Sequence, residues 1–301
     1  LGHSNDFNHQ FWKDFRKAVK EANPNAIILA EHYGNPEGWL QGDEWDTVMN
    51  YDAFMEPLTW FLTGMEKHSD EYREDLLGNS DAFIGAMKNH MRALHMSALQ
   101  TAMNELSNHD HSRFLTRTNH RVGRISYAGA EAASEGVNPA VMREAVAIQM
   151  TWPGAPTVYY GDEAGLCGFT DPDNRRTYPW GREDYQMIDF HRVMIRIHKS
   201  YEVLKTGSLG FLWNDYQGLC YARFSQKEQM IVIINNRAES REVEIQLWQS
   251  GISRLADTKL ERIVMTSAEG FTEEPAEYIA SAGILKLTMP AFGVVVLHHK
   301  N

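Results

Sequence analysis

Apolar residues in the first two thirds of the chain follow two patterns in turn. They recur at helical spacing in four stretches, at residues 11–22, 82–99, 141–150 and 188–201. Short apolar runs between these stretches predict buried strands at residues 26–30, 47–51, 102–106 and 157–160. Strands that alternate with helices indicate βαβ units and a parallel sheet. Four such units are half of an eight-unit β/α barrel.

The pattern changes near Thr206-Gly207. From there on, β-type runs separated by turns occupy residues 219–224, 230–234, 243–247, 284–288 and 293–297. Short strands without intervening helices are typical of an antiparallel β-sandwich. The sequence therefore predicts two domains, half of a barrel over residues 1–205 and a β-sandwich over residues 206–301.

Composition and charge narrow the classes of partner. A chain of 301 residues with 43% hydrophobic content can bury a large core. A net charge of −11 argues against nucleic acid or anionic membrane as partners and favours a neutral substrate. The apolar runs are too short to cross a bilayer. Cys167 and Cys220 make neither a disulfide framework nor a zinc site, which slightly favours a cytoplasmic location.

Two acidic residues stand where predicted strands end. Glu31 follows the run 26–30, and Asp110 closes the segment 106–110. Catalytic groups of β/α barrels project from the carboxyl ends of parallel strands, and two convergent carboxyl groups suggest glycosidic-bond chemistry. Plainer interpretations stay open, because Glu31 could cap a helix and Asp110 could be an N-cap or a partner for Arg113.

Four motifs in order carry a family resemblance. They are Ala-Glu-His-Tyr-Gly at 30–34, Ser-Asn-His-Asp at 107–110, Thr-Val-Tyr-Tyr-Gly-Asp-Glu at 157–163, and the stretch Gly-Phe-Thr-Asp-Pro-Asp-Asn-Arg-Arg-Thr-Tyr-Pro-Trp at 168–180. Together they resemble the α-amylase superfamily of glycoside hydrolases, in particular neopullulanases, cyclomaltodextrinases and maltogenic amylases. The resemblance covers essentially the whole chain. It implies that the predicted strands are strands 5–8 of a (β/α)8 TIM barrel, followed by the family's all-β domain.

The resemblance also implies roles for individual residues. Glu31 matches the acid/base, and Asp110 matches the carboxylate that holds sugar hydroxyls and stabilises the transition state, with His109 as its companion. Asp171 and Arg175 match a pair that grips a glucose ring further along the non-reducing side. The implied activity is hydrolysis, with retention of configuration, of α-1,4-glucosidic bonds in maltodextrins, cyclodextrins, starch or pullulan.

Some aromatic residues and potential metal ligands lie near the predicted strand ends. Tyr33 and Trp39 lie in or near loops at the top of the expected barrel, where aromatic faces can stack on sugar rings. His109, Asp110 and His111 contain metal-ligand types, but adjacent residues rarely point at one ion. We therefore expect no metal and no cofactor, while calcium binding by a longer parent enzyme stays open.

The sequence departs from the family at the nucleophile. The family's Asp lies in a Gly-x-Arg-x-Asp motif at the end of the fourth strand, and neither this motif nor the earlier Asp-x-x-x-Asn-His motif occurs here. We expect the chain to begin just after the nucleophile's strand and to be inactive alone. Its expected partners are an α-glucan oligosaccharide and either the missing half of the barrel or a second copy. The alternative is a non-catalytic carbohydrate-binding or scaffold protein of the same fold.

Overall fold

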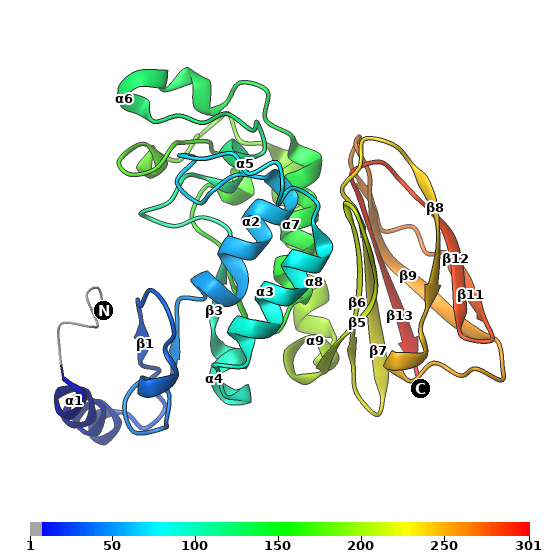
Figure 1. Cartoon of the computed structure of the whole chain (residues 1–301), viewed down its shortest axis with the longest axis horizontal. Helices are drawn as coiled ribbons and strands as arrows, with labels where there is room; N and C mark the ends of the chain where they lie inside the picture. Colours follow the sequence, from blue (N-terminus) through cyan, green and yellow to red (C-terminus); the bar gives the residue numbers. More distant parts are fainter. Residues whose placement is uncertain (1–7) are drawn as a thin grey trace.

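A computed structural model describes residues 8–301, which form an α/β part followed by a curled sheet (Figure 1). The strands of the α/β part are β1 (Leu29–Ala30), β2 (Thr47–Val48), β3 (Met103–Glu105) and β4 (Ala155–Thr157). Its helices are α1 (His9–Ala22), α2 (Glu56–Thr63), α3 (Ser80–Met91), α4 (Met96–Thr101), α5 (Phe114–Arg117), α6 (Ile125–Ala128), α7 (Pro139–Thr151), α8 (Tyr185–Ser200) and α9 (Glu202–Thr206).

The strands of the α/β part lie side by side in chain order and are parallel, as the sequence predicted. β1 pairs with β2, and β3 pairs with β4, both in parallel register. A parallel bridge between Met49 and Met103 joins the two pairs into one array. The carboxyl ends of β1 and β3, which precede Glu31 and the loop of Asp110, therefore point the same way.

Some of the predicted boundaries are wrong in detail, and one helix was not predicted. The stretch 82–99 is two helices, α3 and α4, because the chain extends at His95 with φ −60° and ψ 153°. The fourth strand begins at Ala155 rather than Thr157, and it includes Pro156, whose missing N–H is tolerated because β4 pairs only with β3 among the described strands. Helix α2 was not predicted; it continues a short π-helix, η3 (Tyr51–Met55).

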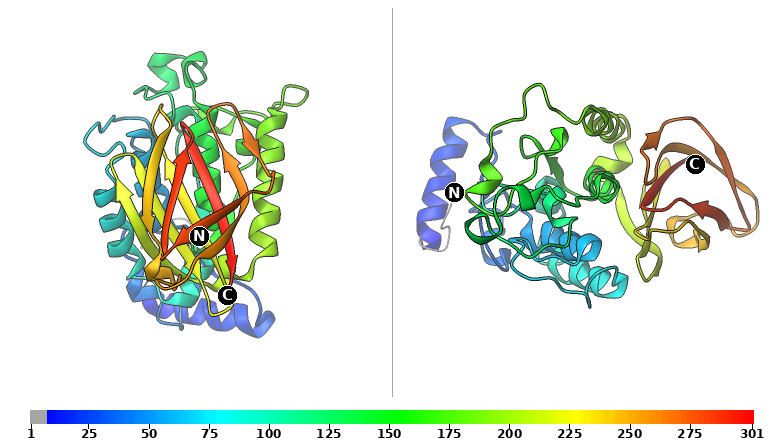
Figure 2. Two further views of the ribbon diagram at one scale, coloured as in Figure 1. Left: turned by 90° about the vertical axis from the view of Figure 1, so that its right-hand side faces the viewer. Right: turned by 90° about the horizontal axis from the view of Figure 1, so that it is seen from above.

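The second part is an antiparallel sheet, as predicted. Its strands are β5 (Ser208–Asp215), β6 (Gly218–Phe224), β7 (Glu228–Asn235), β8 (Arg241–Gln246), β9 (Thr258–Thr266), β10 (Phe271–Thr272), β11 (Glu277–Ser281), β12 (Ile284–Met289) and β13 (Gly293–Lys300). Within the described residues they form one hydrogen-bonded sheet in the order β5-β6-β7-β13-β9-β11-β12-β8, with β10 beside β9. The sheet curls so that its two halves face each other (Figure 2).

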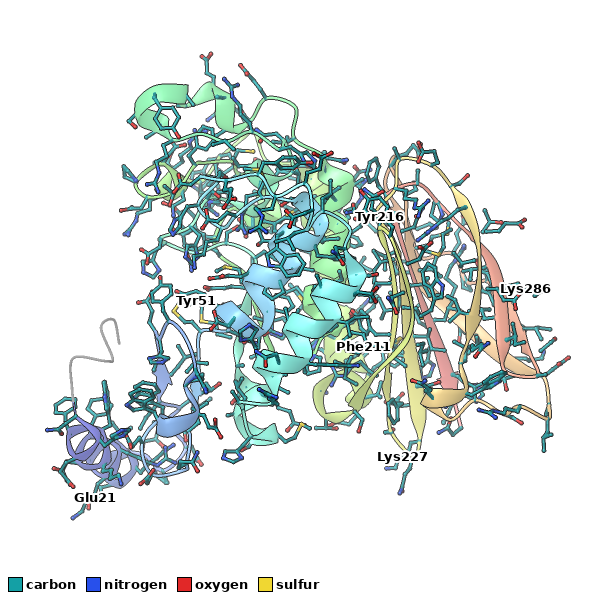
Figure 3. The ribbon with its side chains drawn as sticks, viewed as in Figure 1. Glu21, Tyr51, Phe211, Tyr216, Lys227 and Lys286 are labelled. Atoms are coloured by element: carbon teal, nitrogen blue, oxygen red, sulfur yellow. The ribbon has the colours of Figure 1, made fainter. Side chains whose placement is uncertain are left out.

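The curled sheet is apolar on its inner face, and its outer face is apolar where it meets the helices. Its inner face encloses a core that includes Ile233, Ile245 and Leu285. Its outer face on the β5–β7 side packs against the helices, where the rings of Trp152 and Tyr221 meet with centroids 5.0 Å apart. Figure 3 shows Phe211 on the side that faces the helices and Lys286 on the far side. The β part is thus attached to the α/β part by a buried interface.

Across the described residues, none of the helices combines the length and apolar character that crossing a membrane requires.

Candidate active site

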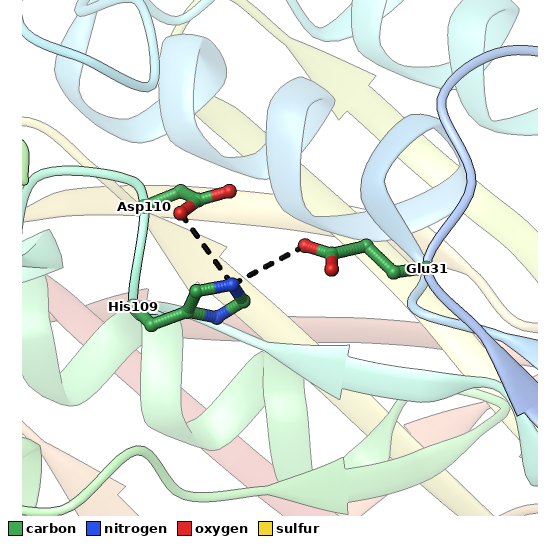
Figure 4. A group of neighbouring side chains, drawn as sticks. All are labelled: Glu31, His109 and Asp110. Carbon is green, nitrogen blue, oxygen red and sulfur yellow. Dashed lines mark ion pairs between the residues drawn. The ribbon is translucent and has the colours of Figure 1, made fainter. Parts of the chain in front are cut away.

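Glu31, His109 and Asp110 come together although they lie far apart in the sequence (Figure 4). Glu31 directly follows β1, and the other two lie in the loop after β3. His109 Nε2 is 3.5 Å from Glu31 Oε1 and 3.4 Å from Asp110 Oδ1. Because the parallel array aligns the ends of β1 and β3, an imidazole lies between two carboxyl groups.

The loop that carries His109 and Asp110 is held by a buried amide. Asn108 Oδ1 accepts hydrogen bonds from the backbone N–H groups of Asp110 and His111, both at 2.9 Å. Asn174, also buried, donates from Nδ2 to the backbone oxygens of Asn108 and His111 at 3.0 and 2.8 Å. These bonds make a tight Asx turn that sets the direction of the Asp110 carboxylate.

Two stacked tyrosines donate to the two carboxyl groups. The rings of Tyr33 and Tyr51 are 4.8 Å apart, with their planes 21° from parallel. Tyr33 donates to Asp110 Oδ2 at 3.3 Å, and Tyr51 donates to Glu31 Oε1 at 2.9 Å. Burial raises the pKa of Tyr33 to about 12, and the charges of Asp110 and Glu31 act in the same direction. Burial also raises the pKa of Tyr51 far above its usual range, so both hydroxyls keep their protons at neutral pH.

Asp171 and Arg175 form a pair beside this cluster. Arg175 Nε lies 2.6 Å from Asp171 Oδ1 and also donates to the backbone oxygen of His109 at 3.0 Å. Its Nη2 lies 3.9 Å from Asp110 Oδ1. Both side chains are 49% exposed, so they can still reach a ligand. The structure therefore brings together six residues that the sequence singled out, which are Glu31, Tyr33, His109, Asp110, Asp171 and Arg175.

Trp39 lies elsewhere. Its ring stacks on Trp45 with centroids 5.1 Å apart and planes 6° from parallel, and it also contacts the rings of His9 and His32. These residues belong to the apolar packing between α1 and the loop after β1. These contacts are those of a packing residue. The prediction that Trp39 contacts substrate stays a prediction.

Sequence reasoning missed several polar residues around the cluster. Tyr51, Asn108 and Glu105 are almost fully buried, and they connect to Glu31. His111 is fully buried, neither ring nitrogen has a hydrogen-bond partner, and burial lowers the pKa of its imidazole to about 2. A glutamate inside the predicted strand 102–106 was the one available signal, because charged residues are rarely buried without a partner.

The same cluster bears on the metal prediction. Glu31, His109 and Asp110 have potential ligand atoms within 4.8 Å of one another, and no further carboxylate, imidazole or thiol of residues 8–301 joins them. The same geometry, with a partly exposed imidazole between two carboxylates, also occurs when the three groups are only hydrogen-bonded to one another. The expectation that no metal binds here stays a prediction.

Carboxyl groups that converge from the carboxyl ends of parallel strands are the arrangement expected of a glycoside hydrolase site. The chain belongs to the α-amylase family of these enzymes, because the family model described as "Alpha amylase, catalytic domain" matches residues 3–273. The family resemblance predicted from the four motifs is thereby confirmed.

Relatives and solved structures agree with this assignment. The chain is 34% identical to Neopullulanase 2 of Thermoactinomyces vulgaris over 82% of this chain and 38% of that protein. It is 30% identical to the cyclomaltodextrinase of a Bacillus species over 77% of this chain and 37% of that protein. The chain thus spans less than two-fifths of the length of these two curated relatives.

Among solved structures, a debranching enzyme from Nostoc punctiforme superposes with a TM-score of 0.73 and 28% identity, over 95% of this chain and 54% of that one. A cyclomaltodextrinase superposes with a TM-score of 0.76 over 100% of this chain and 45% of that one, at 23% identity, which supports the fold alone.

Proposed function

We propose that this chain supplies the acid/base and the transition-state-stabilising carboxylate of an enzyme that hydrolyses α-1,4-glucosidic bonds with retention of configuration. The substrates would be maltodextrins, cyclodextrins, starch or pullulan. The observation that carries the proposal is the convergence of Glu31 and Asp110 on His109, at the carboxyl ends of β1 and β3, which lie on either side of β2. Relatives named neopullulanase and cyclomaltodextrinase support the substrate class.

In the proposed mechanism Glu31 donates a proton to the departing glycosidic oxygen while a carboxylate nucleophile attacks the anomeric carbon. Glu31 then removes a proton from the water that releases the covalent sugar. Asp110, held by the Asx turn, binds ring hydroxyls together with His109, and these contacts would strengthen as the ring flattens. Tyr33 fits this role, because its hydroxyl donates to Asp110 and its side chain is 48% exposed.

Asp171 and Arg175 would bind a neighbouring glucose unit. Their ion pair is exposed, and an exposed pair of this kind adds less than about 1 kcal/mol to stability. A role in substrate binding explains their position next to Asp110 better than a role in folding. Both residues offer hydrogen bonds to sugar hydroxyls without moving far.

We further propose that the nucleophile comes from a segment outside residues 1–301, and that this chain divides into half a barrel (strands 5–8, residues 1–205) and a β-sandwich domain (residues 206–301). Among the described strands, β1 pairs only with β2 and β4 only with β3. Apolar residues lie exposed near both free edges, with Ile27 65% exposed before β1 and Tyr160 40% exposed after β4. Unpaired edges favour association, so the missing half or a second copy would cover them.

The test is an activity measurement on the purified 301-residue chain. We expect no turnover of maltotriose or cyclodextrin by the chain alone, and turnover once a segment carrying the nucleophile strand is co-expressed with it. Turnover by the chain alone would refute the shared-site proposal. If the purified chain is a monodisperse monomer with one sharp unfolding transition, the proposal that a partner covers the edges of β1 and β4 is contradicted.

A further inference from the structure

A line of hydrogen bonds connects a buried carboxyl group to Glu31. Asn108 donates from Nδ2 to Glu105 Oε1 at 2.8 Å and to the Tyr51 hydroxyl at 3.2 Å. Tyr51 in turn donates to Glu31 Oε1 at 2.9 Å. Glu105, Asn108 and Tyr51 are each at most 2% exposed. The line therefore runs through the interior and reaches the surface only at Glu31.

The direction of each bond follows from the chemistry of the amide. Asn108 Oδ1 already accepts from two backbone N–H groups, so its NH₂ group must face Glu105 and Tyr51. An NH₂ group can only donate, so the Tyr51 oxygen accepts from Asn108 and its own proton is left to donate. The alternative acceptors are the Tyr33 hydroxyl, which is neutral, and Met49 Sδ at 3.5 Å, which is a weak thioether. A carboxyl oxygen at 2.9 Å accepts more strongly than either, so the proton points to Glu31.

The charge state of Glu105 agrees with this arrangement. Burial raises the pKa of Glu105 to about 8, so the group is a neutral acid at pH 7. Glu31, Asp162 and Arg117 are the charged groups that act on it, and Tyr51 is the nearest titratable hydroxyl. A neutral Glu105 accepts from Asn108 without placing a second negative charge behind Glu31.

We propose that Glu105, Asn108 and Tyr51 are positioning residues that orient the Glu31 carboxyl for proton transfer. Tyr51 anchors one oxygen of that carboxyl, which sets the direction of the other. Asn108 links this anchor to the turn that holds Asp110, so the two carboxyl groups are oriented by one amide. The proposal rests on the proposed role of Glu31 as the acid/base.

The test measures kcat and KM for maltotriose in the full-length protein that carries residues 1–301. Tyr51→Phe removes one hydroxyl and should lower kcat about tenfold with KM unchanged, because one hydrogen bond to a charged group is lost. Tyr127→Phe is the matched control, since Tyr127 is 68% exposed and lies outside the line; it should leave kcat unchanged.

Two substitutions at Glu105 separate positioning from packing. Glu105→Gln mimics the protonated carboxyl and still accepts from Asn108, so it should keep kcat at pH 7, whereas Glu105→Leu should lower kcat about tenfold. Ionisation of Glu105 should also lower the kcat of the unmodified protein above about pH 8, and this loss should be absent in Glu105→Gln. A purely structural role would not change the pH profile.

Glu31→Gln separates failure of this proposal from failure of the proposed function. We expect this variant to lose about a thousandfold in kcat. If Glu31→Gln loses activity while Tyr51→Phe and Glu105→Leu keep theirs, the positioning proposal is overturned and the function stands. If Glu31→Gln keeps full activity, both are overturned. Should Glu105→Leu fail to fold, Tyr51→Phe alone decides, because it leaves the packing almost unchanged.

Discussion

The curled sheet and the four-strand array differ in how they bury their apolar side chains. The curled sheet has strands of up to nine residues and encloses an apolar core that includes Ile233 and Leu285. The array has strands of two or three residues, and the small cluster Met49, Tyr51 and Met55 lies against it. The curled sheet encloses its own core. The four-strand array has polar groups at its strand ends and unpaired edges among the described strands, and both are available to a partner.

This difference shows how the molecule combines stability with a site. Long antiparallel ladders that fold over their own side chains supply stability without polar groups in the core. The array tolerates Glu105 and Asn108 beside its strand ends because hydrogen bonds join these side chains to each other, to Tyr51 and to the backbone. A stable scaffold and a polar site are thus built by separate sheets of the same chain.

The largest expected effect is at the junction of the two parts. Arg223 is fully buried and donates to the backbone oxygens of Thr151, Leu204 and Gly207. Arg223→Met should lower the free energy of unfolding by about 4 kcal/mol, because it leaves several buried carbonyl groups without donors. Urea unfolding followed by circular dichroism measures this. Arg192→Met, at a side chain 72% exposed, is the control and should change little.

A substitution that creates a cavity in each sheet tests whether the curled sheet is packed more completely than the array. Ile233→Ala should cost about 3 kcal/mol, because Ile233 is fully buried in a complete core. Met49→Ala should cost about 1 kcal/mol, since its cluster has few members that could lose contacts. Equal losses in urea unfolding would mean that the array is packed as completely as the curled sheet.

A buried carboxyl without a partner should make stability depend on pH. Glu144 in α7 is fully buried, neither oxygen has a hydrogen bond, and burial raises its pKa well above the usual 4.5. The folded state keeps Glu144 neutral, whereas the unfolded chain ionises above about pH 4.5. The free energy of unfolding is therefore unaffected by this ionisation below about pH 4.5, and it falls as the pH rises above that value. Glu144→Gln should gain about 1 kcal/mol on the unmodified protein for each pH unit between 5 and 7. A difference that does not change with pH would contradict this.

The smallest expected effect is on the exposed face of the curled sheet. Lys286 in β12 pairs with Glu244 in β8 at 2.8 Å, and both side chains are more than half exposed. Lys286→Ala should change the free energy of unfolding by less than about 0.5 kcal/mol, because solvent screens such pairs. Thermal melts at low and high salt measure it, and a loss above about 1 kcal/mol would mean that this edge depends on charge pairing.

The elements that the sequence predicted well are those with a strong local pattern. Helix α1 begins at His9, and Asn8 caps it by accepting from the Phe11 N–H. The helical spacing of its apolar residues can be read from the sequence of the helix alone. The apolar runs that became β6, β7 and β13 were equally clear. Strand β9 was missed because Lys259, Glu261 and Arg262 interrupt its apolar pattern, and only its neighbours β11 and β13 make it a strand.

For the site, the sequence by itself predicted the two acids, His109 and the Asp171–Arg175 pair, because each lies in a short motif that can be recognised locally. Only the tertiary structure decided that Tyr51, Asn108 and Glu105 stand behind Glu31. Their hydrogen bonds join η3 and the segment after β3 to the end of β1, and no local spacing predicts such contacts. Motifs are local, whereas the orientation of a carboxyl group is set by whatever the fold brings next to it.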